Sequence, residues 1–320
     1  MNNSILLKYT KEVSEEQISR NKMIFRISLW VFILNALIAL IKLAGGFLFR
    51  SLSMLGDGID SLGDVLATAS VLVAAKWLQK PPDKDHPWGH DRADTLASKF
   101  INFFMFFMGT QLLIRSVETL LRFEPNQPPD NMGIIVISLS IALKLGMAIS
   151  LKKEGQNQES AMLKTNAQNM ANDVVLSASV LIGIIASQFF QTNFIDVVTA
   201  CLVSFWIIYH SIQGFNKTNL ELMDGLKEPE LYQKVFNAVD SVNGAFNPHR
   251  VRIRRFADRY LIDLDVEMNG KISLEEAHRL GCEVECEIKK ALPQVYDIML
   301  HLEPKGNQEN ERYGLSRSKL

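Results

Sequence analysis

Long apolar stretches separated by short charged connectors make up the first two thirds of the chain. Each stretch reaches roughly the 20 residues that an α-helix needs to cross the hydrocarbon core of a membrane. The pattern therefore predicts six membrane-spanning helices, of which the second and the fifth carry the most polar residues. The predicted spans are 24–47, 53–79, 100–121, 132–152, 166–188 and 192–214.

From residue 216 onward the chain becomes polar, and its pattern indicates a soluble α+β domain. PELYQKVFNAVDSV predicts a helix, VRIRRFADRYLIDLDVEM a hairpin, SLEEAHRLGCEVECEIKKAL a capped helix and VYDIMLHLEP a strand. The order α-β-β-α-β predicts a small open sheet with helices on one face. The predicted segments are an N-terminal lead (1–23), a six-helix membrane domain (24–215), this soluble domain (216–304) and a disordered tail (305–320).

Positive charge is concentrated on one set of connectors. The N-terminal lead and the second–third and fourth–fifth connectors are rich in lysine and arginine, whereas the opposite connectors carry little beyond Arg50 and Arg122. Because cytoplasmic loops carry an excess of these residues, both termini of this multi-pass chain are expected in the cytoplasm.

The overall charge excludes one class of partner. The chain has 34 Lys+Arg against 35 Asp+Glu and a net charge of -1, so it lacks the clustered basic face of a nucleic-acid-binding protein. The VRIRR run is interpreted as the solvated side of an edge strand. Cys201, Cys282 and Cys286 are too few and too poorly spaced for a disulfide framework or a structural zinc site.

Three aspartates interrupt the second apolar stretch, in GDGIDSLGDV. Asp57, Asp60 and Asp64 are spaced i, i+3 and i+7, so a helix places them on one face. The fifth stretch contains NMANDV, where Asn169 and Asp173 share a face at spacing i, i+4. Uncompensated carboxylates are costly inside a membrane, and a divalent cation bound between the two helices would neutralise them.

Two other interpretations of these polar residues remain open from the sequence alone. They could hydrogen-bond between helices, or they could cap a break near Gly56, Gly58 and Gly63. Asp57 could be an outer partner of the metal ligands, a proton carrier or an acceptor at a helix interface.

The chain from about residue 24 to Pro304 resembles the cation diffusion facilitator family. The resemblance rests on SLSMLGDGIDSLGDV, HPWGHDRADTL and NMANDV, with LMDG, EAHRLG and HLEP in the soluble part. It implies a divalent-metal exporter of the plasma (inner) membrane, without a prosthetic group, whose six-helix bundle is followed by a cytoplasmic ferredoxin-like domain that forms a homodimer. The transport site implied by the resemblance is Asp60, Asp64, Asn169 and Asp173.

The ligand set departs from the zinc-transporting members of the family. Those members have histidine where Asn169 stands here, and often where Asp60 stands. Carboxylate and amide oxygens favour harder ions than imidazole does. Among family members, this Asp-Asp-Asn-Asp set resembles that of the bacterial manganese exporters. We expect Mn²⁺ first, then Fe²⁺, then Zn²⁺, Co²⁺ or Cd²⁺, exported by alternating access in exchange for protons.

Other function classes have less support. A membrane metalloenzyme would need a nucleophile–base pair or a second acidic motif, and the sequence presents neither. A passive channel or a non-transporting scaffold with the same fold is the remaining alternative, although an intact ligand set argues against a scaffold.

The resemblance implies three further groups of residues outside the transport site. A connector metal site would use Asp83, His86 and His90, although Pro87 and Gly89 indicate a turn there and histidines can equally cap a helix. A regulatory site in the soluble domain would draw on His249, Asp265, His278, His301 and Glu303, although His249 and His278 could be ordinary surface histidines. A salt bridge between Arg92 and Asp224 would tie the soluble domain to the bundle, and His210 is expected at an interface rather than on a metal.

Overall fold

The computed structural model describes residues 26–27, 29–78, 83–87, 89–90, 92–122, 127–157, 161–256, 259–307 and 313–317. The predicted lead over 1–23 lies outside these residues. The chain divides into two compact units, Met1–Val73 with Phe100–Phe215, and Ala74–Lys99 with Asn216–Leu320.

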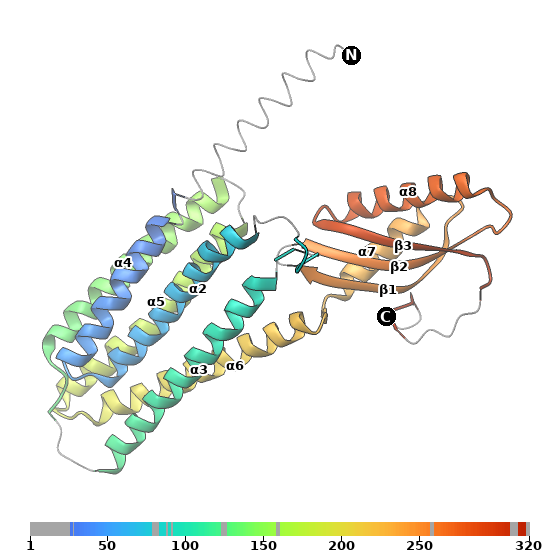
Figure 1. Ribbon diagram of the computed structural model, residues 1–320. Helices are drawn as coiled ribbons and strands as arrows, with labels where there is room; N and C mark the ends of the chain where they lie inside the picture. The colour runs from blue at the N-terminus through green and yellow to red at the C-terminus, as the bar shows by residue number, and fades with distance from the viewer. Residues whose placement is uncertain are drawn as a thin grey trace. The chain divides into compact units, whose positions relative to one another are not determined.

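Long helices build the first unit, and three of them continue past its bounds into residues of the second (Figure 1). They are an initial helix (Leu29–Leu48), α2 (Leu52–Leu78), α3 (Arg92–Leu121), α4 (Asn131–Asn157), α5 (Ala161–Phe189) and α6 (Phe194–Leu222). Each helix overlaps one predicted span, and α3 to α6 extend beyond theirs. Hydropathy marks only the part of a helix that lies in lipid, whereas backbone hydrogen bonding continues into the polar ends.

Five helices in the described part of the chain are long and apolar enough to cross a membrane. They are the initial helix, α3, α4, α6 and the part of α5 from Leu163 to Phe189. The count is one short of the six expected. The helix that differs is α2, which has a sufficient length of 27 residues but carries the three aspartates.

Apolar side chains both fill and cover the helical unit. Met54, Ile137, Val180, Ile184 and Val203 form a buried cluster that joins α2, α4, α5 and α6. Large apolar side chains also lie exposed on the outside of the helices. Examples are Ile135, Ile149, Ile182 and Leu202, each more than half exposed. An exposed apolar surface of this kind is what a surrounding lipid bilayer accommodates.

The start of α2 is held by a buried carboxylate from α6. Asp196 accepts hydrogen bonds from the Ser51 hydroxyl at 2.7 Å and from the Leu52 backbone N–H at 2.8 Å, and also from the Ser53 hydroxyl. From this anchor α2 continues without interruption through Gly56, Gly58 and Gly63, so the break near these glycines that the sequence left open does not occur.

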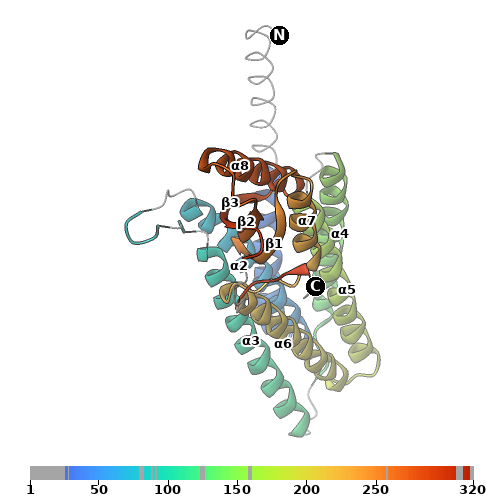
Figure 2. The same cartoon turned by 90° about the vertical axis from the view of Figure 1, so that its right-hand side faces the viewer.

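The second unit contains a three-stranded sheet with two helices. Its elements are α7 (Pro229–Asp240), β1 (Phe246–Phe256), β2 (Arg259–Met268), α8 (Leu274–Ala291) and β3 (Val295–Pro304). The order of these elements is the predicted one. The strands lie side by side in the order β1-β2-β3 (Figure 2). β1 is antiparallel and β3 parallel to β2 (Figure 1).

Both helices cover the same face of the sheet. Phe236 of α7 and Val284 of α8 belong to one apolar core with Ile262, Leu264 and Val266, which alternate along β2. The other face is therefore left to the intervening residues of the strands. The side chain of Ser273 accepts a hydrogen bond from the Glu276 backbone N–H at 3.2 Å, as the capping signature at the start of α8 predicts.

Part of the tail expected to be disordered is paired with β1. Val251 and Leu315 exchange backbone hydrogen bonds of 3.0 and 2.9 Å in an antiparallel bridge, and the Arg317 guanidinium pairs with Asp240. The sequence did not indicate this contact, because a single backbone bridge requires no alternating apolar pattern and the tail is polar in composition.

The arginines of VRIRR have acidic neighbours, with Arg252 Nε 3.9 Å from Asp263 Oδ2.

Candidate metal centre

Three carboxylates from two helices converge inside the helical unit. Asp60 and Asp64 lie one turn apart on α2, and Asp173 extends from α5. Each offers one oxygen, and these oxygens all lie within 4.8 Å of one another. Asp173 is buried and the other two are half-buried. Three carboxylate oxygens at this separation can bind one hard cation in common.

The fourth predicted ligand is placed differently. Asn169 lies one turn before Asp173 on α5, as its spacing requires, but its side chain is exposed. The structure therefore brings the three predicted carboxylates together, and the Asn169 side chain is exposed one turn away on α5.

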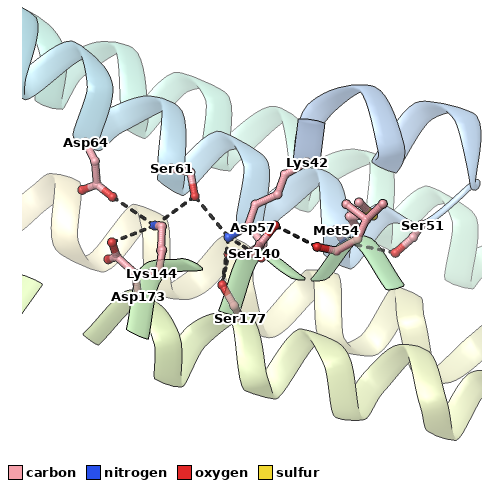
Figure 3. Close-up of polar contacts among 11 residues, drawn as sticks. Lys42, Ser51, Met54, Asp57, Ser61, Asp64, Ser140, Lys144, Asp173 and Ser177 are labelled. Atoms are coloured by element: carbon pink, nitrogen blue, oxygen red, sulfur yellow. Dashed lines mark hydrogen bonds and ion pairs between the residues drawn. The ribbon is translucent and has the colours of Figure 1, made fainter. Parts of the chain in front are cut away.

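A buried lysine lies against this cluster. Lys144 of α4 is 1% exposed, and its Nζ atom donates to Asp173 Oδ2 at 2.7 Å (Figure 3). The same nitrogen lies 3.6 Å from Asp64 Oδ2 and donates to the Ser61 hydroxyl at 3.2 Å. Lys144 therefore bridges α2 and α5 at the carboxylate cluster.

A second buried lysine accounts for Asp57. Lys42 of the initial helix is fully buried, with Nζ 2.8 Å from Asp57 Oδ2. Ser177 of α5 accepts from this ammonium at 2.8 Å and donates to Asp57 Oδ1 at 2.9 Å. Ser61 also accepts from Lys42, at 3.3 Å, and so lies between the two lysines (Figure 3). Asp57 is therefore a paired acceptor at a helix interface, one of the three roles left open for it.

Sequence reasoning missed both lysines. Each is a single charge within an apolar run of a predicted span, in LIKLA and ALKLG. An ionisable residue within a membrane helix indicates function by default, and this signal was available. Four buried or half-buried aspartates face two ammonium groups, which leaves two negative formal charges, the charge that one divalent cation would balance.

The predicted connector site is brought together in the second unit. Ligand atoms of Asp83, His86 and His90 lie within 4.8 Å of one another, and the positive φ of Gly89 confirms the turn. Hydrogen bonds to Asp83 from the His86 backbone N–H (2.7 Å) and side chain lower the pKa of this exposed carboxyl from its usual value, and the Asp85 backbone N–H adds to them. The charged form of Asp83, which is the form that binds metal, is therefore favoured.

The predicted site in the soluble domain is brought together in part, on the sheet face away from the helices. His249, Asp265 and Glu303 are buried, one on each strand, with ligand atoms within 4.8 Å of one another. His249 Nε2 lies 3.5 Å from Glu303 Oε2, and the exposed His301 lies 3.4 Å from Glu303 Oε1. His278 lies on α8, where its Nε2 atom is 3.8 Å from Cys282 Sγ, and it belongs to none of the three clusters.

Two further predicted features are found as contacts. The guanidinium of Arg92 pairs with Asp224 and donates to the Leu222 carbonyl at 3.0 Å. His210 packs its ring against Trp206 and Tyr209, with centroids 4.3 and 5.6 Å away. His210 is thus part of an aromatic contact and lies outside the three acidic clusters.

Two family models match the chain. The cation efflux transmembrane domain covers residues 28–223, and the cytoplasmic domain of cation efflux proteins covers residues 228–305.

Individual relatives agree with these matches. The manganese efflux system protein MneS of Bacillus subtilis is 29% identical over 82% of this chain and 90% of its own length, and MneP of the same organism is 23% identical over 90% and 97%. Among solved structures, the metal-bound C-terminal domain of the CzcD transporter from Thermotoga maritima is 38% identical, with a TM-score of 0.25 over 26% of this chain and 95% of that chain.

Proposed function

We propose that this chain, which belongs to the cation diffusion facilitator family of divalent-metal efflux transporters, exports Mn²⁺ from the cytoplasm. The convergence of Asp60, Asp64 and Asp173 inside the helical unit carries the proposal. MneS and MneP are manganese efflux proteins, and the similarity of this chain to them supports the choice of metal.

In this proposal α2 also crosses the membrane, which brings the number of membrane-spanning helices to six. Its aspartates face the initial helix, α4 and α5 rather than lipid. Lys42 of the initial helix and Lys144 of α4 offset part of their charge. The transport site comprises the three converging aspartates together with Asn169, whose exposed amide would complete the oxygen ligands when the helices rearrange. The soluble domain is a cytoplasmic ferredoxin-like module through which two copies associate.

The ligand chemistry supports manganese over zinc. A set of carboxylate and amide oxygens suits hard divalent ions, whereas zinc gains most from imidazole and thiolate. Fe²⁺ is the nearest competitor, followed by Zn²⁺, Co²⁺ and Cd²⁺.

Export would proceed by alternating access. The site opens to the cytoplasm, binds the cation, closes and reopens outward, as transporters with sites near the bilayer midplane do. Protons carried by the aspartates on the return step would couple export to the proton gradient. The connector cluster and the soluble-domain cluster would bind metal as auxiliary or regulatory sites.

The transport site is tested by Asp64→Ala in proteoliposomes. We expect uptake of Mn²⁺ driven by an imposed pH difference to fall by about tenfold or more, because a ligand carboxylate is lost. Glu118→Ala is the matched control, since Glu118 is an exposed acid of α3 and should leave uptake unchanged. Parental uptake in Asp64→Ala would show that the aspartate cluster is not the transport site.

The choice of metal is tested by growth of an exporter-deficient host that expresses the chain. Rescue from manganese stress is expected, and rescue from zinc but not manganese would overturn the selectivity argument. A rate of Mn²⁺ uptake that does not depend on the imposed pH difference would indicate a channel rather than a proton exchanger.

A further inference from the structure

Lys144 already pairs with two of the carboxylates that a transported ion would need. Its nitrogen is 2.7 Å from Asp173 Oδ2 and 3.6 Å from Asp64 Oδ2, two oxygens of the carboxylate cluster. A hard divalent cation binds carboxylate oxygens at roughly 2.0–2.6 Å. An ion bound to both oxygens would therefore lie within about 5 Å of the ammonium nitrogen. Like charges at that distance repel strongly in a buried site.

We propose that Lys144 is a tethered competitor of the transported metal. It holds Asp64 and Asp173 in the empty site, leaves them when a divalent cation enters, and returns to them when the cation is released. This inference rests on the proposed export function and assigns one residue of α4 to its selectivity and its return step.

The surroundings of Lys144 give the displaced ammonium a place to go. The Ser61 hydroxyl already accepts a hydrogen bond from the Lys144 nitrogen at 3.2 Å. This hydroxyl is not one of the proposed metal ligands, so it stays available when the carboxylates bind the metal. The flexible four-carbon stem of lysine lets the nitrogen move between such partners without movement of the helix.

Competition of this kind discriminates by charge. A monovalent cation would replace one positive charge by another and gain little, whereas a divalent cation adds a net charge to a cluster in which carboxylates outnumber ammonium groups. Release of the metal would leave the carboxylates facing Lys144 rather than one another, so the empty site can close and reorient.

The test separates binding, exchange and net transport in Lys144→Gln. We expect the variant to bind Mn²⁺ about tenfold or more tightly, since the competing charge is gone. Exchange of Mn²⁺ across proteoliposomes loaded with Mn²⁺ on both sides should persist, because it needs no empty return. Net Mn²⁺ uptake should fall by about tenfold or more, because the empty site has lost its internal cation.

Lys42→Gln is the matched control. It removes an equally buried lysine that pairs with Asp57 instead of the cluster. We expect exchange and net uptake to change together in this variant, with no gain in Mn²⁺ affinity.

Lys144→Arg keeps the experiment decisive if Lys144→Gln does not fold. Arginine retains the charge and can grip carboxylates with two donors, so it should compete better and weaken Mn²⁺ binding by about tenfold.

Unchanged affinity in Lys144→Arg, or a parallel loss of exchange and net uptake in Lys144→Gln, would reduce Lys144 to a structural counter-ion. Failure of the unmodified protein to catalyse either flux would instead refute the proposed export function.

Discussion

At the scale of single residues, each buried charge in the described helices has an opposite charge or hydroxyl nearby. Lys42 faces Asp57, and Lys144 faces Asp173, each at 2.7–2.8 Å. Removing one member of such a pair leaves the other charge buried and unpaired, which typically costs roughly 3–5 kcal/mol. The stability of the bundle and the chemistry of the cluster therefore depend on the same side chains.

Glu267 provides a residue-scale prediction in the soluble domain. Burial raises the pKa of this carboxyl, but hydrogen bonds from the Asn247 side chain at 2.6 Å and the Gly306 backbone N–H at 2.9 Å outweigh it and lower the pKa. A carboxyl with a lowered folded-state pKa stabilises the fold above its unfolded value of about 4.3, and this stability is lost as the pH falls through the folded value.

We therefore expect Glu267→Gln to lower the thermal unfolding midpoint at pH 7 and to weaken its decline below about pH 4.3. Thermal unfolding in detergent between neutral and acidic pH measures both effects. Glu275→Gln, at an exposed position of α8, is the control and should retain the parental pH profile. An unchanged profile in Glu267→Gln would contradict the assignment.

The sequence predicted the acidic residues of the candidate site better than their basic partners. Spacing alone put Asp60 and Asp64 on one face of α2, and chain order could not show that Lys144 of α4 would reach them. Contacts between helices far apart in sequence depend on the packing of the bundle, which no local pattern encodes. The exposed position of Asn169 is a second consequence of that packing.

At the scale of elements, α2 owes its close packing to glycine. A Cβ atom placed on Gly58 would lie 2.9 Å from Leu43 Cδ2 and 3.0 Å from the Leu43 backbone nitrogen, closer than side-chain carbons normally approach. Only glycine lets α2 lie this near the initial helix. That approach also brings Lys42 within reach of Asp57.

Gly58→Ala should therefore separate α2 from the initial helix. We expect a loss of stability of roughly 1–3 kcal/mol, as for other overpacked sites, together with reduced Mn²⁺ uptake. Gly146→Ala on α4 is the matched control, since a Cβ there meets no atom within 4 Å among the described residues. Equal unfolding midpoints for the two variants would show that the close approach is not needed.

Hydropathy predicted where the helices lie along the chain, but it did not predict the residues at which they begin and end. The predicted third span starts at residue 100, whereas α3 starts at Arg92, because its first two turns are polar and carry no lipid-facing signal. The soluble domain was predictable in order because its strands alternate and α8 begins with a capping serine. The bridge between Leu315 and Val251 of β1 depends on backbone hydrogen bonds, which composition does not reveal.

At the scale of the whole molecule, Arg92 and Asp224 join segments about 130 residues apart in the chain, at the start of α3 and just after α6. Both side chains are partly exposed, so the pair should add only about 0–1 kcal/mol to stability. Its larger effect should be on function, because it fixes where α3 begins relative to the segment that leads into the sheet.

A double-mutant cycle tests this role. We expect Arg92→Ala and Asp224→Ala each to lower Mn²⁺ uptake, and the double variant to be no worse than either, since both changes break one contact. Arg279→Ala, which breaks the exposed pair with Glu283 on α8, serves as the control and should leave uptake unchanged. If the fold-loss of Mn²⁺ uptake in the double variant equals the product of the two single fold-losses, the two residues act independently.

The bridge between Val251 and Leu315 has a consequence for crowded membranes. An outermost strand with unsatisfied amides invites the same strand of another molecule, and such additions can propagate into fibres. Here Leu315 occupies one position on that edge of β1. A second copy that extended the sheet at β1 would first have to displace this bridge, so the bridge disfavours that mode of assembly at this edge.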